Sequence, residues 1–304
     1  MKSWHDFLDK QRNATREVHI GLVGKYDLQD AYKSIRESLN LAATYNDVKA
    51  KLHFVNSEDI TRENVAEKLQ GLAGIIICPG FGSRGIEGKI VAAEFTRTHD
   101  IPTFGICLGM QMIVIEFARN VLGYKDANSA EFSGGLGNSS FSGLGINETS
   151  PNDQTTKRPN DQSPKQPTYV IDLMEEQKKV TQMGGTMRLG AYECELKEGS
   201  KTAQAYTAVN AQISKLKTQN SNHLSPLTIS ERHRHRYEFN NAYLQEYEQH
   251  GMKCVGINPA ANLVEIVEIP DKRWYIGTQF HPEYSSTVLQ PHPLFMSFVK
   301  ECAE

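Results

Sequence analysis

The chain has 304 residues, of which 39% are hydrophobic, and a formal net charge of −3 at pH 7. This balance excludes binding to nucleic acid or to an anionic membrane by bulk charge, and no apolar run approaches the ~20 residues of a membrane-spanning helix. The charged N-terminus lacks an apolar signal-peptide core, and the five cysteines show no pairing pattern, so we expect a cytoplasmic protein without a disulfide scaffold.

Short apolar segments alternate with helical patterns through the first part of the chain. Segments with the length of buried strands lie at Val18–Val23, Lys51–Val55, Ala73–Cys78 and Pro102–Ile106. Helical patterns lie at Ala31–Tyr45, Thr61–Leu69, Glu87–Thr98 and Met110–Asn120. Such alternation predicts an α/β fold with a mostly parallel central sheet and helices on both faces.

The rest of the chain is predicted to complete the same single domain, residues 17–304. One helix is expected at Ala242–His250. Further strands are expected at Met187–Leu196, Cys254–Asn258, Leu263–Ile269 and Trp274–Phe280.

Three segments fall outside this α/β pattern. We expect residues 1–16 to be a linker tail with a short amphipathic helix around Trp4, Phe7 and Leu8. Residues from about 133 to 168 have almost no apolar side chain after Ile146, so burial cannot offset the entropy of ordering them. We predict a disordered insertion there and a polar loop at about 210–226.

The segment Gly105-Ile106-Cys107-Leu108-Gly109 joins a predicted strand to a predicted helix. A Gly-x-nucleophile-x-Gly turn in this setting is a nucleophile elbow, which raises one side chain above the edge of a sheet. The glycines are required because a Cβ would crowd the turn, and the helix N-terminus favours a thiolate. Cys107 is therefore the candidate nucleophile; the alternative is a buried structural cysteine.

A candidate base for this thiol lies near the C-terminus. His281 and Glu283 follow the strand-like run that begins at Trp274, and residues two apart in extended chain point the same way. Glu283 can then accept the second ring N–H of His281 and orient the imidazole, as the third member of a catalytic triad does. No C-x-x-C or H-x-x-x-H spacing indicates a metal site.

Several motifs resemble one family. The sequence GICLGMQ around Cys107 and the HPE motif at His281 resemble the class I, triad-type glutamine amidotransferases. Segments at 20–34, 81–90, 126–132 (DANSAEF) and 231–241 (ERHRHRYEFNN) resemble the glutaminase domain of the CTP synthases. The resemblance covers about residues 18–284 and implies a flavodoxin-like fold that hydrolyses L-glutamine through a thioester on Cys107.

The resemblance also implies which residues form the substrate site. The oxyanion hole would use backbone N–H groups of Gly80 and Leu108. The usual Pro-Gly-Gly-Phe-Gly loop reads Cys-Pro-Gly-Phe-Gly here, and Pro79 has no N–H to offer. The residues that would contact glutamine are Gly80, Gln111 one helical turn after the thiol, Glu131 at the ammonium, Arg236 at the carboxylate, and Tyr237 beside it.

A lid and further partners follow from the same resemblance. Residues 81–90 would form a lid through which GTP activates hydrolysis, and the residues that match the family's lid are Phe81, Gly82, Arg84 and Glu87. Alternatively, Arg84 makes only a surface ion pair. The full enzyme would be a homotetramer in which an N-terminal amidoligase domain uses UTP, ATP and Mg. No G-x-x-x-x-G-K-[ST] loop occurs here, so we expect no cofactor in this chain.

Other functions remain open at this point. Another triad-type glutaminase or a γ-glutamyl hydrolase would share the elbow, and a non-catalytic interaction module would share the fold. The arginines of the ERHRHR run (residues 231–236) also permit a nucleic-acid patch, although a single basic run in an acidic protein disfavours this.

Overall fold

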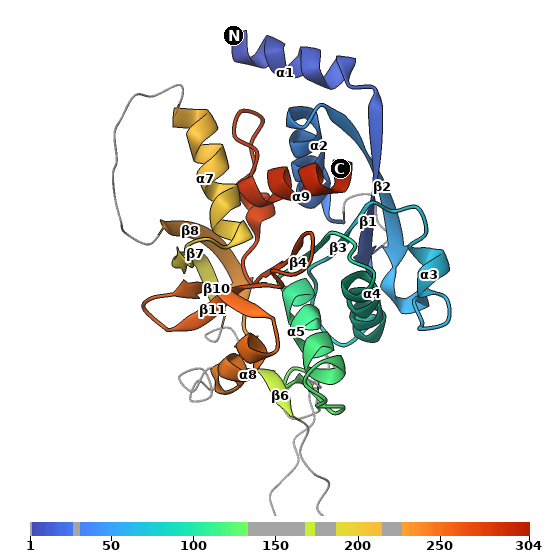
Figure 1. Ribbon diagram of the computed structural model, residues 1–304, viewed down its shortest axis with the longest axis vertical. Helices are drawn as coiled ribbons and strands as arrows, with labels where there is room; N and C mark the ends of the chain where they lie inside the picture. The colour runs from blue at the N-terminus through green and yellow to red at the C-terminus, as the bar shows by residue number, and fades with distance from the viewer. Residues whose placement is uncertain (1, 27–30, 133–167, 174–186, 215–226) are drawn as a thin grey trace, which may run out of the picture.

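A nine-stranded sheet forms the centre of the protein, in the order β2-β1-β3-β4-β12-β11-β10-β7-β8. The computed structural model describes residues 2–26, 31–132, 168–173, 187–214 and 227–304 (Figure 1). Parallel pairing joins β2 (Val48–Asn56), β1 (Arg16–Gly24), β3 (Gly74–Ile77), β4 (Thr103–Ile106) and β12 (Tyr275–Thr278). Antiparallel pairing adds β11 (Leu263–Glu268), β10 (Lys253–Asn258), β7 (Arg188–Leu196) and β8 (Leu227–His235).

The parallel half of the sheet is covered on both faces. Strands β3, β4 and β12 are buried along their whole length. Helices α2 (Lys33–Tyr45) and α9 (Pro293–Ala303) pack together on one side, and α4 (Ile86–Thr98) and α5 (Leu108–Asn120) pack together on the other (Figure 1). Each side has its own apolar core, built around residues such as Phe104 and Phe298 on one side and Ile77 and Ile113 on the other. This confirms the predicted α/β architecture.

In the antiparallel half, β11 is buried along its whole length, whereas the outer strands β7 and β8 are more exposed. Helix α7 (Lys201–Ser214) packs against α9. Strand β8 alternates between buried and exposed residues toward its C-terminal end, as a strand with one covered face does. Helix α8 (Leu244–Gln249), which follows the short turn η3 (Asn241–Tyr243), buries Tyr247 against Phe117 of α5 with ring centroids 5.6 Å apart.

A second, small sheet pairs strands from distant parts of the chain. It consists of β5 (Asn128–Ser129), β6 (Tyr169–Asp172) and β9 (Glu238–Phe239), with β6 in the middle. Glu131 lies just after β5, and Tyr237 lies just before β9. The small sheet therefore brings two distant parts of the chain to the same place.

Most predicted elements are present, with differences at their ends. Helix α3 (Val65–Lys68) is shorter than predicted because the Asn64 side chain accepts a hydrogen bond from the N–H of Thr61 at 2.8 Å, which closes a turn there instead. The remaining short turns are η1 (Ser57–Asp59) and η4 (Pro282–Tyr284). Sequence patterns did not predict the helices α7 and α9, the strand β8, or the small sheet.

The segments predicted to be irregular have different outcomes. The tail contains helix α1 (Lys2–Asn13), whose Phe7 is buried and lies 5.9 Å from the ring of Tyr45, so this tail is packed onto the domain. The predicted insertion lies outside the described residues except for Thr168, whose hydroxyl donates to Asp126 at 3.3 Å. Residues 210–214 of the second predicted loop are helical, because α7 continues to Ser214, and the rest lies outside the described residues. None of the helices in the described ranges is both long and apolar enough to cross a membrane.

Candidate active site

The turn at Cys107 has the strained geometry of a nucleophile elbow. Cys107 connects β4 to α5 with φ 53° and ψ −107°, a conformation that residues with side chains rarely adopt. A Cβ on Gly109 would lie 2.0 Å from the carbonyl oxygen of Ile77, and a Cβ on Gly105 would lie 2.5 Å from Cδ1 of Ile113. Both glycines are needed because α5 approaches the strands so closely. The turn places Cys107 at the N-terminus of α5.

The predicted base leaves the neighbouring strand. His281 follows β12, which pairs in parallel with β4, so the two side chains emerge at the same edge of the sheet. Nδ1 of His281 lies 2.7 Å from Oε1 of Glu283, and both residues are buried. The backbone N–H of His281 donates to the carbonyl oxygen of Arg232 on β8 at 2.8 Å, which anchors this loop.

Electrostatics favour a charged imidazole next to the thiol. Burial alone lowers the pKa of His281, but the neighbouring Cys107 thiolate and the Glu283 carboxylate outweigh burial and raise that pKa well above its usual value. In the described part of the chain, Nε2 of His281 has no hydrogen-bond partner other than the thiol to which it is coupled. The arrangement therefore supports an imidazolium–thiolate pair, oriented by Glu283.

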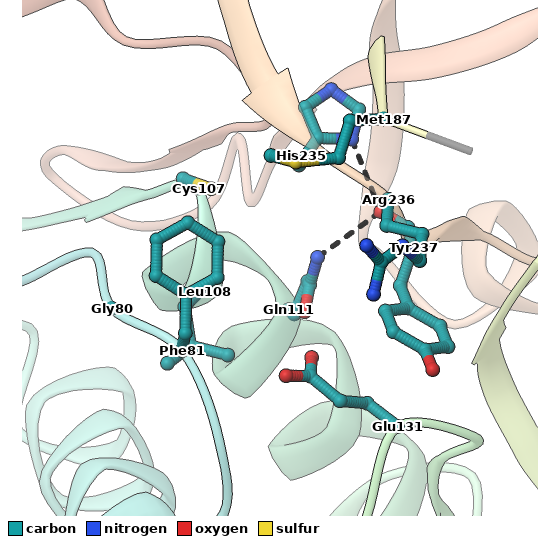
Figure 2. A pocket seen from close by; sticks show the side chains of 10 residues that line it. All are labelled: Gly80, Phe81, Cys107, Leu108, Gln111, Glu131, Met187, His235, Arg236 and Tyr237. Atoms are coloured by element: carbon teal, nitrogen blue, oxygen red, sulfur yellow. Dashed lines mark hydrogen bonds between the residues drawn. The ribbon is translucent and has the colours of Figure 1, made fainter. Parts of the chain in front are cut away.

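A pocket opens beside Cys107 (Figure 2). Figure 2 shows the Glu131 carboxylate, the Gln111 amide and the Arg236 guanidinium facing the same space. Nε2 of Gln111 donates to the carbonyl oxygen of Tyr237 at 3.2 Å and to Oε1 of Gln279 at 3.3 Å. The residues that line the pocket are Gly80, Phe81, Cys107, Leu108, Gln111, Glu131, Met187, His235, Arg236 and Tyr237. Every residue that the sequence predicted to contact glutamine is among them.

Comparison with known proteins gives the family of this fold and site. The model of the class-I glutamine amidotransferases matches residues 27–301. The structure of the Trypanosoma brucei CTPS glutaminase domain with bound acivicin superposes with a TM-score of 0.73, at 32% sequence identity and with 94% of each chain covered. The chain belongs to the class-I glutamine amidotransferases, as a glutaminase domain of the CTP synthase type.

Curated CTP synthases agree with this assignment. The enzyme of Bacteroides thetaiotaomicron is 58% identical over 99% of this chain, and that of Porphyromonas gingivalis (strain ATCC 33277) is 49% identical over 99% of it. The matches cover 48% and 47% of those proteins. The glutaminase-type chain thus spans about half the length of the curated relatives it matches.

The segment predicted to be a lid, residues 81–90, makes two kinds of contact. Near the pocket, the N–H of Gly82 donates to Oε1 of Glu131 at 3.1 Å, and the Phe81 ring is half exposed. Farther out, Arg84 pairs with Glu58 and Glu87 pairs with Arg119, both at 2.8 Å. Arg84 and Glu87 therefore make surface ion pairs and do not line the pocket.

Sequence reasoning missed two lysines beneath the Gly80 turn. Nζ of Lys89, which is fully buried, donates to the carbonyl oxygen of Cys78 at 2.6 Å, and burial lowers the pKa of Lys89 to about 8. Nζ of Lys25 donates to the carbonyl oxygen of Phe81. These contacts fix the turn on both sides of Gly80. For Lys89 the signal was its place in the apolar stripe of α4, between Ile86 and Ile90.

Met187, His235 and Gln279 were also missed. Met187 and His235 line the pocket, and Gln279 bonds the Gln111 amide. His235 was visible in the ERHRHR run, where alternate residues of a strand would point inward. Met187 and Gln279 carried no local signal, since their roles depend on strands that pair across the sheet.

The other four cysteines, and the histidines His19, His53 and His99, do not line the pocket. Cys78, Cys194, Cys254 and Cys302 are buried free thiols, and burial raises the pKa of Cys78 to about 12. His19 and His53 contact each other, and His99 contacts the carbonyl oxygen of Phe95. Among the described residues, no three potential ligands gather in a way that would hold a metal ion.

Proposed function

We propose that this chain hydrolyses L-glutamine to glutamate and ammonia through a thioester on Cys107. The observation that carries the proposal is the junction of a strained elbow thiol, a buried His281–Glu283 pair and a pocket with both a carboxylate and a guanidinium. A free α-amino acid needs that pair of opposite charges in its binding site.

The residues divide the work of acyl transfer. The Cys107 thiolate attacks the side-chain amide carbon of glutamine, and the C–N bond breaks as His281 protonates the departing ammonia. His281 then takes a proton from water, which attacks the thioester, releases glutamate and restores the thiolate. Glu283 holds the imidazole in the required tautomer and stabilises its charged form.

The oxyanion that develops needs backbone donors nearby. Gly80 and Leu108 line the pocket beside Cys107, and a Cβ on Gly80 would lie 3.5 Å from Cδ2 of Leu108. We assign the N–H groups of these two residues to the oxyanion. The lysines below the turn support this assignment, because they hold the carbonyl groups on either side of Gly80 in place.

The substrate would be held at both ends of its backbone. Glu131 would bind the α-ammonium group, and Arg236 would bind the α-carboxylate with its planar fork. Gln111 and Tyr237 would complete the wall between them. Burial raises the pKa of Glu131, while the Gly82 N–H, Lys25 and Arg236 favour its charged form. An incoming ammonium group would favour that form further.

Removal of the thiol tests the proposal. Cys107→Ala and Cys107→Ser are expected to abolish ammonia release from L-glutamine while the fold is retained, and Cys254→Ala, which alters a buried thiol away from the pocket, is the matched control. A chloro-isoxazole electrophile should label Cys107 alone, as read by mass spectrometry. Activity that persists in Cys107→Ala, or labelling mainly at Cys78, contradicts the assignment.

The similarity to CTP synthases supports a wider role. We propose that the ammonia serves the amination of UTP by an ATP- and Mg-dependent amidoligase domain, within a cytoplasmic homotetramer activated by GTP. The GTP response would pass through the lid residues Arg84 and Glu87. In the glutaminase joined to its amidoligase, Arg84→Ala should remove GTP stimulation of hydrolysis; identical stimulation in wild type and variant excludes Arg84 from the switch.

A further inference from the structure

The histidines of the ERHRHR run point into the protein. His233 and His235 are buried on β8, whereas Arg232 and Arg234 are exposed, because alternate residues of a strand face opposite sides. The hydrolysis proposed above uses neither histidine. Two buried imidazoles next to a binding pocket therefore need an explanation of their own.

The two histidines form a continuous chain of contacts that ends at the pocket. Nε2 of His233 lies 3.1 Å from Oε2 of Glu265 on β11, and Nδ1 of His233 lies 2.8 Å from Nε2 of His235. Nδ1 of His235 lies 3.2 Å from the carbonyl oxygen of Tyr237. Gln111 donates to the same carbonyl group from the other side (Figure 2). This series of contacts thus reaches the backbone of Tyr237, which lines the pocket together with Arg236.

The number of protons in this series of contacts decides whether His235 can donate a hydrogen bond to the Tyr237 carbonyl group. A carbonyl oxygen only accepts, so Nδ1 of His235 must carry a proton, and His235 Nε2 must then accept from Nδ1 of a neutral His233. Nε2 of that neutral His233 has no proton, and it faces a carboxylate that has none either. Three contacts need three protons, but two neutral imidazoles and an ionised Glu265 supply only two.

Charge balance favours the third proton. Arg188 on β7 donates to Glu238 at 3.1 Å and to Glu265 at 3.0 Å, and all three are buried. One cation and two carboxylates leave a net negative charge that is costly to bury. One bound proton makes the cluster neutral and satisfies every contact in the chain.

Between the two carboxylates, geometry places this proton on Glu265, because only there does it complete the contact between Oε2 of Glu265 and Nε2 of His233. Burial raises the pKa of Glu265 to about 7, and burial lowers the pKa of His233 and of His235. Burial raises the pKa of Glu238 as well, to about 8, but a proton on Glu238 would leave that contact without one. A charged His281 further disfavours a second imidazolium nearby. The ionisable groups that face the chain from the elements packed against it are Arg188, Tyr192 and Cys194 on β7, Glu238 on β9, and His281 after β12.

We propose that Glu265, His233 and His235 form a proton-dependent positioning relay that holds the Tyr237 carbonyl group and thereby sets the glutamine affinity of the pocket. The proposal rests on the function assigned above. With a proton on Glu265, each member donates to the next and the last donates to Tyr237. When Glu265 loses that proton, both imidazoles change tautomer to serve its carboxylate, and the Tyr237 carbonyl group loses its donor from His235.

The variant Glu265→Gln tests the relay, because an amide donates to His233 at every pH and still accepts from Arg188. In wild type, the KM for glutamine should rise about 5- to 10-fold as the pH increases through about 7, as expected for one lost hydrogen bond. In Glu265→Gln this rise should be absent. Glu116→Gln alters another buried carboxylate held by an arginine, Arg97, and should keep the wild-type dependence. The same pH dependence of KM in wild type and Glu265→Gln overturns the relay.

A second measurement needs neither a variant nor activity. In protein with ¹⁵N-labelled imidazole rings, NMR should show His233 and His235 both protonated at Nδ1 below about pH 7 and both at Nε2 above it. A proton on Nε2 of His233 throughout this range overturns the relay, even if glutamine hydrolysis is confirmed. If the wild type does not hydrolyse glutamine, the proposed function is contradicted instead. The NMR measurement would still report the tautomers of His233 and His235.

Discussion

The parallel and antiparallel halves of the sheet contribute differently to the site. Cys107 and His281 leave β4 and β12, which are neighbours in the parallel half and are buried on both faces. Arg236 and Tyr237 lie between β8 and β9, where the antiparallel half meets the small sheet that also positions Glu131. The groups proposed to break the bond thus belong to the parallel half, and the groups proposed to bind the substrate backbone belong to the region where three distant segments meet.

This division predicts two kinds of variant. Changes in the parallel half should alter kcat or the fold itself, because backbone geometry positions the nucleophile and the base. Changes around the small sheet should alter mainly KM, because the groups there are proposed to contact only the unreactive end of the substrate. The following changes test this separation.

The largest effect is expected from Glu283→Gln. The carboxylate raises the pKa of His281, so its removal lowers that pKa and leaves less imidazolium to protonate ammonia as the pH rises. We expect kcat to fall by on the order of 10³-fold with little change in KM. Steady-state kinetics across pH would measure this, with the surface carboxylate variant Glu94→Gln as control. A change confined to KM would contradict the division.

Gly109→Ala should destabilise the fold of the parallel half. The added Cβ would lie 2.0 Å from the carbonyl oxygen of Ile77, so α5 must move away from β3 at a cost of about 3 kcal/mol in the free energy of unfolding. Gly199→Ala is the control, since Gly199 has φ 77° but open space around it, and it should cost only about 1 kcal/mol. Urea unfolding measures both; equal losses would show that close packing at the elbow is unimportant.

Glu131→Gln should affect recognition alone. The amide oxygen can still accept from the N–H of Gly82, but the charge that faces the substrate ammonium is lost. We expect KM for glutamine to rise about 10- to 100-fold while kcat changes little. Glu246→Gln, which changes a carboxylate bonded to Tyr124 outside the pocket, should leave KM unchanged. An equal fall in kcat would place Glu131 in the chemical step.

The smallest effect is expected from deletion of residues 134–167. Their composition predicts that they add little to the folded state, and shortening a polar connection changes the closure entropy by less than about 1 kcal/mol. The strands on either side, β5 and β6, are already paired. Thermal stability and KM should therefore be nearly unchanged. A large rise in KM would assign the deleted segment to the pocket.

Much of the parallel half could be predicted because its signals are local. A short apolar run predicts each buried strand, and the two glycines around Cys107 predict a turn in which no Cβ fits. The order of strands and helices up to Asn120 follows from these signals. The small offsets, such as the later start of α3, arise from single side-chain bonds like that of Asn64, which propensity does not register.

The sequence by itself predicted a nucleophile and its base and determined the class of the fold, because local sterics and apolar spacing depend on adjacent residues. Tertiary structure alone decided that β6 pairs with β5 and β9 and so brings Glu131 near Tyr237. It also decided that Lys25 and Lys89 hydrogen-bond the Gly80 turn, and that Glu265 contacts His233. These contacts join residues far apart in the chain. Their energies depend on burial and on shared protons, and neither exists until the sheet has formed.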